Sequence, residues 1–123
     1  MAKRFLHVLA LLLAICTCGC FTVPEGIHMA QYADVKAGNM DIRADRFGAG
    51  EIPAVVITGC GGRNVTVRVM DLSTNNVVKT YREYVPEDWT RWWWFKDLPA
   101  GSYKVELIIQ GDVMATTAFT VIQ

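Results

Sequence analysis

Side chains that could carry chemistry are few and scattered in this 123-residue sequence. Cys60 lies within Gly59-Cys60-Gly61-Gly62, a stretch that invites comparison with a phosphate-cradling loop. Such loops lead into a helix whose amides face the phosphate, whereas residues 64–69 (NVTVRV) predict a strand. We therefore interpret residues 59–62 as a turn. Cys60 is interpreted as a buried or incidental thiol, because no histidine accompanies it in the sequence to activate it.

The other candidates for catalysis or metal binding are isolated from one another. His28 has no second histidine and no cysteine at ligand spacing, which favours a surface residue over a metal ligand. Carboxylates are spread along the chain, and no stretch offers the alternating oxygen ligands of a calcium loop. The sequence therefore predicts a protein that is not an enzyme and that requires no cofactor or metal. A small hydrolase, with carboxylates or the Cys60 thiol meeting in a cleft, remains an alternative.

The four tryptophans are the most unusual feature, and three of them are consecutive. We predict a strand over Arg91–Lys96, in which neighbouring side chains point to opposite faces. Alternation puts Trp93 and Phe95 on one face and Trp92 and Trp94 on the other. The corner resemblance described below, in which the residues three and five before the corner leucine point inward, implies that Trp93 and Phe95 face the core and that Trp92 and Trp94 face outward.

We predict that Trp92 and Trp94, together with Trp89, form a binding surface. Exposed aromatic rings can stack on sugars or contact another protein. They can also be covered by a segment of the same chain, here Ile27–Gly38. These three uses remain open at the level of sequence.

The amino terminus has the layout of a secretory signal. Lys3 and Arg4 precede an apolar stretch from Phe5 to Ile15, which is too short for a comfortable transmembrane helix, and the sequence CTCGC follows. An ordinary secretory signal, cut nearby, is the simplest alternative for this layout.

A signal that ends in cysteine resembles that of bacterial lipoproteins, which are cut before a cysteine carrying a diacylglyceryl group. Cys20 follows Gly19, the small residue that such a cut favours, so the resemblance implies lipidation of Cys20; Cys18 is the competing position. Several acyl chains at one terminus make a stable membrane anchor. Phe21 is not the aspartate associated with inner-membrane retention, so the resemblance implies the outer membrane, facing the periplasm, in a host with two membranes.

Removal of residues 1–19 leaves ten basic and twelve acidic side chains, a formal charge of −2. This balance gives no basic face for nucleic acid. Cys60 is then the one cysteine left besides Cys20, which excludes a disulfide framework within the mature domain.

From Asn39 onward, short apolar-alternating segments are separated by turn signals, the spacing typical of an all-β sandwich. Residues 27–38 are interpreted as an irregular lead-in to the first strand, with a short helix as the alternative. Seven strands are predicted: Met40–Arg46, Ala54–Thr58, Val65–Asp71, Val77–Val85, Arg91–Lys96, Tyr103–Gln110 and Met114–Ile122.

The segment LPAGSY joins the tryptophan strand to the strand predicted over Tyr103–Gln110. Pro99 presets φ for a turn, and Gly101 is expected to supply a positive φ. The segment resembles the corner of immunoglobulin-like and fibronectin-type-III-like sandwiches, in which a tyrosine bonds back to nearby backbone. The resemblance assigns these roles to Leu98 and Tyr103 and implies the fold, without a function.

The predicted layout is a signal peptide over 1–19, a lipid-anchored tether and lead-in over 20–38, and one immunoglobulin-like β-sandwich of about seven strands over 39–123. The predicted function is that of a cell-envelope lipoprotein acting as a non-catalytic binding or assembly module. Its expected partners are the membrane and an envelope protein or glycan. A carbohydrate-binding module using the tryptophans is the alternative.

Overall fold

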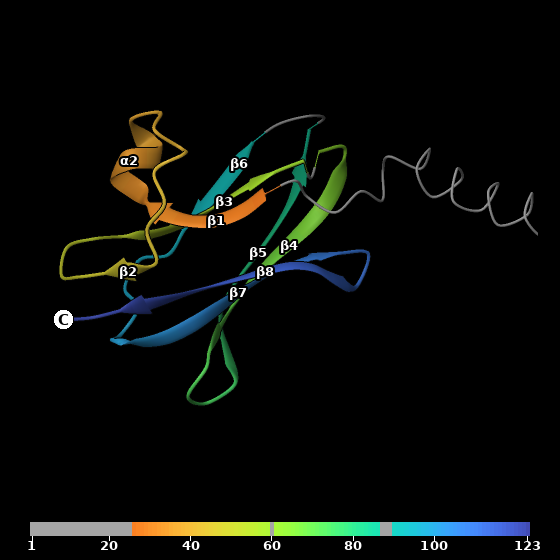
Figure 1. Ribbon diagram of the computed structural model, residues 1–123. Helices are drawn as coiled ribbons and strands as arrows, with labels where there is room; N and C mark the ends of the chain where they lie inside the picture. Colours follow the sequence, from red (N-terminus) through yellow and green to blue (C-terminus); the bar gives the residue numbers. More distant parts are fainter. Residues whose placement is uncertain (1–25, 60, 87–89) are drawn as a thin grey trace, which may run out of the picture.

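The protein is a two-layer β-sandwich (Figure 1). The structure, a computed structural model, describes residues 26–59, 61–86 and 90–123. Within them it has eight strands and one short helix: β1 (Gly26–Gln31), α2 (Tyr32–Lys36), β2 (Arg46–Phe47), β3 (Pro53–Thr58), β4 (Arg63–Asp71), β5 (Asn76–Val85), β6 (Arg91–Trp94), β7 (Gly101–Ile109) and β8 (Asp112–Val121).

The strands form a three-stranded sheet in the order β1-β3-β6 and a five-stranded sheet in the order β2-β8-β7-β4-β5. Every pairing is antiparallel except that of β2 with β8. The predicted class, an all-β sandwich of the immunoglobulin-like kind, is confirmed.

Six of the seven predicted strands are present as β3 to β8, with ends that differ by two residues or fewer. The predicted strand Met40–Arg46 is wrong, because only its last residue enters the short β2. The first strand is instead β1, which lies in the segment interpreted as a lead-in. β1 pairs with β3, and Gly26 lies opposite Thr58. Local alternation does not reveal a pairing partner so far along the chain.

The core lies between the two sheets and follows the expected alternation of side chains. In β4 and β7 every second residue is buried, and the intervening residues face away from the other sheet. The buried side chains of this core come from both sheets: Met29, Phe47, Val55, Ile57, Val65, Val67, Val69, Val85, Trp93, Phe95, Tyr103, Val105, Leu107, Ile109 and Phe119.

The corner before β7 has the predicted tyrosine bond. The Tyr103 hydroxyl donates to the Pro99 carbonyl oxygen at 2.6 Å, and Leu98 packs partly buried against the core. Burial raises the pKa of Tyr103, and the nearby charge of Asp71 raises it further. The expected positive φ at Gly101 is wrong, because Asp97 carries it instead with φ of 61°.

Two tight reversals use residues that tolerate the left-handed region. Asn75 has φ of 60° between β4 and β5, and Gln110 and Gly111 have φ of 53° and 83° between β7 and β8. These turns close the two hairpins of the five-stranded sheet, β4–β5 and β7–β8. A carboxylate supports the first turn: hydrogen bonds from the Ser73 hydroxyl and backbone N–H lower the pKa of Asp71.

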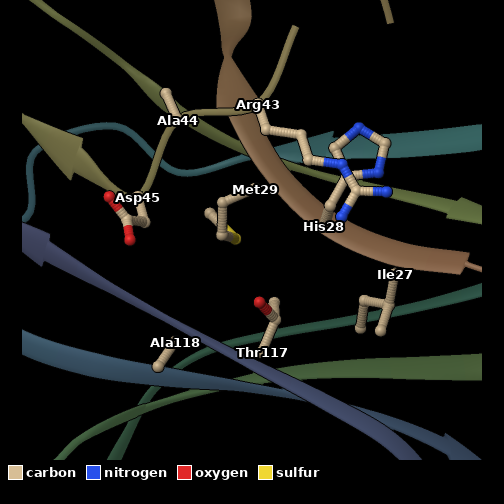
Figure 2. Close-up of a pocket in the computed structure, with 8 residues that line it drawn as sticks. All are labelled: Ile27, His28, Met29, Arg43, Ala44, Asp45, Thr117 and Ala118. Atoms are coloured by element: carbon tan, nitrogen blue, oxygen red, sulfur yellow. The ribbon is translucent and has the colours of Figure 1, made fainter. Parts of the chain in front are cut away.

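One side of the sandwich, which we call the closed side, is crossed by backbone as the chain passes from the three-stranded to the five-stranded sheet, and a pocket of about 400 Å³ lies beside this crossing. Ala44 N–H donates to the Met29 carbonyl of β1 at 2.9 Å, and Thr120 N–H donates to the Asp45 carbonyl at 2.8 Å. Figure 2 shows this crossing, with Met29 and Thr117 directed into the space between the sheets. Phe47 of β2 completes it and is fully buried.

Candidate functional site

The tryptophan strand β6 has the predicted register. Trp93 and Phe95 face the core and are 6% and 1% exposed. Trp92 lies opposite Val56, and Trp94 lies opposite Ala54, on the outer face of the three-stranded sheet. Trp94 is 39% exposed, and Trp92 is half-buried. Trp89 lies outside the described residues.

The outer tryptophans are partly covered by the segment that contains α2. The Tyr32 ring stacks on Trp94, with centroids 4.8 Å apart and planes 6° from parallel. Trp92 packs against a second small core on the outer face, formed by Ala30, Val35, Ala54 and Val56. Of the three uses left open by the sequence, the geometry matches a cover from the same chain for much of the indole surface.

What remains accessible lies at the other side of the sandwich, which we call the open side. It is bordered by β5 and β6, the edge strands of the two sheets. Between them is a groove of about 480 Å³. Its lining comes from the central part of β5 and from all of β6: Thr80, Tyr81, Arg82, Glu83, Arg91, Trp92, Trp93 and Trp94.

The open side exists because the three-stranded sheet is narrower than the five-stranded sheet and leaves part of the inner face of β5 without a described strand across from it. Tyr81 and Glu83 lie opposite Val67 and Val65 of β4, so their side chains point toward the other sheet. Both are nevertheless half-buried, because no further strand faces them within the described residues. The Tyr81 ring contacts Phe95, with centroids 5.9 Å apart, and burial raises the pKa of Tyr81.

Side chains alone bridge the open side among the described residues. Arg91 donates to both carboxylate oxygens of Glu83, at 2.9 Å from Nε and 2.5 Å from the terminal nitrogen. The Arg91 guanidinium also lies over the Trp93 ring, 5.6 Å from its centroid. The Tyr81 hydroxyl donates to the Trp94 carbonyl oxygen at 3.3 Å.

The backbone of β6 presents hydrogen-bonding groups to this groove. Phe95 N–H donates to the Pro53 carbonyl at 2.9 Å, so Phe95 directs its backbone groups toward β3. In an antiparallel pair this direction alternates along the strand. Trp92 and Trp94 therefore direct their N–H and C=O groups away from β3, and the bond from Tyr81 to the Trp94 oxygen agrees with that direction.

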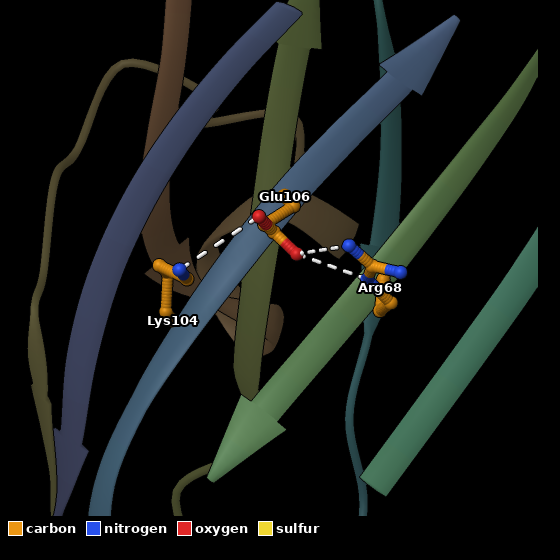
Figure 3. Close-up of polar contacts among 3 residues, drawn as sticks. All are labelled: Arg68, Lys104 and Glu106. Carbon is orange, nitrogen blue, oxygen red and sulfur yellow. Dashed lines mark hydrogen bonds and ion pairs between the residues drawn. The ribbon is translucent and has the colours of Figure 1, made fainter. Parts of the chain in front are cut away.

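A second polar cluster lies on the outer face of the five-stranded sheet and is self-contained (Figure 3). Glu106 is 6% exposed and lies directly opposite Arg68 on the neighbouring strand. Arg68 donates to one carboxylate oxygen at 2.9 and 2.7 Å, and the Lys104 ammonium lies 3.7 Å from the other. Its charges satisfy one another across strands, so it offers no chemistry to a ligand.

His28 lies on the outer face of β1, and its Nε2 is 2.6 Å from the Met40 carbonyl oxygen. Across the described ranges, no group of three or more histidine, cysteine, aspartate or glutamate side chains is placed to hold a metal ion. No helix in the same ranges is long and apolar enough to cross a membrane. The predicted lipidation site, Cys20, and the thiol of Cys60 lie outside the described residues.

The sequence interpretation missed the contributions of Tyr32, Tyr81 and Glu83. The run Pro53–Ile57 (PAVVI) could have predicted that the α2 segment covers the outer face of the three-stranded sheet, because it is apolar at every position. All five of its residues are buried. A strand without polar alternation is buried on both faces. No comparable signal identifies Tyr81 and Glu83, because their roles depend on which strands lie across from β5.

Comparison with known proteins adds little to this description. No family model matches the chain, and no curated protein matches it. Among solved structures, a CARDB domain from Pyrococcus furiosus, crystallised in complex with di-metal ions, is 13% identical over 83% of this chain and 91% of that domain, with a TM-score of 0.41. At this level the likeness carries no argument about the site, and the fold stands on the sheets described above.

Proposed function

We propose that this chain is a lipid-anchored, non-catalytic binding module of the cell envelope, and that its contact surface is the open side. The observation that carries the proposal is the groove between β5 and β6, lined by tryptophan, tyrosine and arginine. Aromatic and arginine side chains dominate binding energy at protein interfaces. The outer tryptophans named by the sequence contribute the parts of their indoles that the α2 segment leaves uncovered.

The anchor and the open side are compatible with one another. The signal-like segment ends at Cys20, and the first strand begins at Gly26. The six residues from 20 to 25 span at most about 20 Å when extended. Acylation of Cys20 therefore places the end of the sandwich where β1 begins close to the lipid surface. The groove runs along the side of the sandwich, where a partner in the envelope can reach it.

A carbohydrate-binding role is less well supported. Sugar stacking requires an open, flat ring face, and Tyr32 occupies one face of Trp94. The charged side chains that face the groove, Glu83 and Arg91, are bound to each other. We therefore place a protein partner ahead of a glycan.

The anchor is tested by replacement of its cysteine. In cells fed a labelled fatty acid, Cys20→Ser should abolish acyl labelling and leave the chain unprocessed or soluble, while Cys18→Ser should retain the label. Full labelling of Cys20→Ser with loss in Cys18→Ser would move the site to Cys18. If neither substitution matters, the lipoprotein proposal fails.

The contact surface is tested with the purified full chain in detergent, cross-linked to envelope extract. Arg91→Ala at the groove should reduce the cross-linked species, because an arginine at an interface is a frequent anchor. Lys104→Ala, on the outer face of the five-stranded sheet, is the matched control and should leave cross-linking unchanged. Equal cross-linking by wild type and Arg91→Ala, together with a loss in Lys104→Ala, would move the surface to that face.

A further inference from the structure

We infer that the open side receives an extended, apolar polypeptide segment, which adds as a fourth strand to the free edge of β6. The inference rests on the proposed function, because it names the class of partner for the same groove. It is carried by the backbone of β6, by the half-covered inner face of β5 and by the paired charges of the groove.

The first argument is the hydrogen-bonding pattern of the edge. Within the described residues, the N–H groups of Trp92 and Trp94 and the carbonyl of Trp92 have no partner, while the Trp94 carbonyl holds the Tyr81 hydroxyl at a long 3.3 Å. An added strand supplies donors and acceptors at this spacing. A glycan hydroxyl can meet one such group, but its rings do not repeat with the period of a strand.

The second argument is the space opposite β5. An added strand beside β6 extends the three-stranded sheet to four strands and lies across from β5. Its inward side chains then meet Tyr81 and Glu83, which point toward the other sheet and are half-buried. Its outward side chains lie beside Trp92 and Trp94. The segment that fits is therefore extended and apolar on the tryptophan side, with alternate residues of mixed polarity.

The third argument is charge. Arg91 and Glu83, the charged side chains that face the groove, neutralise each other. Arg82 lies opposite Thr66, so its side chain points to the outer face of the five-stranded sheet and away from the groove. The side chains that the groove offers are therefore aromatic or internally paired, which commits the occupant to an apolar peptide.

The edge also explains why β6 can stay open in the absence of a partner. Natural proteins protect exposed edges by keeping them short or by placing charges on them. β6 has four residues, and Arg91 of β6 places a charge at the groove. These features discourage nonspecific edge pairing while leaving room for a matching segment.

The test uses a library of random ten-residue peptides displayed on phage, selected on the full chain purified in detergent. We expect enrichment of peptides with alternating apolar residues. Trp94→Pro removes the backbone N–H at the free edge, and proline is a residue that edge strands accept. Trp94→Ala is its matched control, because it removes the same indole and keeps the N–H.

A synthetic copy of an enriched peptide should bind Trp94→Pro at least tenfold more weakly than Trp94→Ala. N-methylation of alternate peptide residues should abolish binding in one of the two registers and spare it in the other, a readout that does not depend on any variant folding. Amide hydrogen exchange at Trp92 and Trp94 should slow when the peptide binds.

Three results would overturn the inference. The first is a selection without enrichment, and the second is equal binding of the peptide by Trp94→Pro and Trp94→Ala with no change in amide exchange. The third is evidence for a different occupant. If chitotetraose binds both the wild type and Trp94→Pro, the occupant is a glycan. If the wild type sediments as a dimer and Trp94→Pro does not, the occupant is a second copy of the chain. Loss of envelope cross-links in Arg91→Ala, with no peptide enriched, would leave the proposed function standing and remove this inference alone.

Discussion

The two sides of the sandwich are spanned by different chemistry. On the closed side, backbone bonds join the sheets through Ala44, Asp45 and Phe47. On the open side, an ion pair, a tyrosine hydroxyl bond and aromatic contacts span the gap. A pocket lies on each side. The backbone bonds do not depend on the identity of any single side chain, whereas a partner can rearrange the side chains that span the open side.

The largest expected losses of stability come from removing one large buried ring on each side of the sandwich. Trp93→Ala on the open side and Phe47→Ala on the closed side should each destabilise the fold by about 3–5 kcal/mol, because each removes a large buried ring. Arg46→Ala, the exposed neighbour in β2, is the control and should change stability by less than about 0.5 kcal/mol. Urea denaturation measures all three. A tolerant Trp93 with an intolerant Trp92 and Trp94 would mean that the register of β6 is off by one residue.

A smaller effect is expected from the cover of the outer tryptophans. The double variant Trp92→Ala, Trp94→Ala should lose about 2–4 kcal/mol, less than two fully buried tryptophans, because both are partly exposed. Tyr32→Ala should reproduce part of the loss, since it removes the ring stacked on Trp94. Thermal melts of these variants give the comparison. An unchanged melting temperature in the double variant would show that the cover contributes nothing to stability.

The corner and groove tyrosines should produce a pH dependence above neutrality. The folded-state pKa values of Tyr103 and Tyr81 are raised above the ordinary 10.0. Their contribution is fully present below about pH 10 and is lost as pH rises through the folded values. Tyr103→Phe should cost about 0.5–1.5 kcal/mol at neutral pH and weaken the alkaline loss. Urea midpoints from pH 7 to 11 measure both, and an alkaline loss of full size in a variant lacking both hydroxyls would contradict the assignment.

The smallest energetic effect, and the sharpest contrast between the sides, concerns the ion pair of the open side. Glu83→Gln should cost no more than about 1 kcal/mol, because both partners are about one-third exposed and screened by solvent. Amide exchange at Trp92 and Trp94 should already be fast in the wild type, while Trp93 and Phe95, bonded to β3, should exchange slowly. Uniformly slow exchange along β6 would mean that its edge is not free.

The sequence alone predicted the features that depend on local pattern. Alternation along Val65–Val69 and Tyr103–Ile109 identified inward faces, and the left-handed tendency of Asn75 and Gly111 marked reversals. The register of β6 followed from period two and one corner leucine. Each of these properties is set by residues within one strand or turn, so it can be found without knowledge of the partner strands.

Tertiary structure decided what depends on distant neighbours. β1 was missed because Gly26–Gln31 carries little alternation of its own and gains its strand through pairing with β3 and burial on both faces. The open side follows from a count of three strands against five, which places Tyr81 and Glu83 across from no described strand. Pairing and layer size are properties of contacts between segments far apart in the chain. Residue types and periodicity determined which way the tryptophans of β6 point, and the packing of α2 and β5 around them determined which parts stay free.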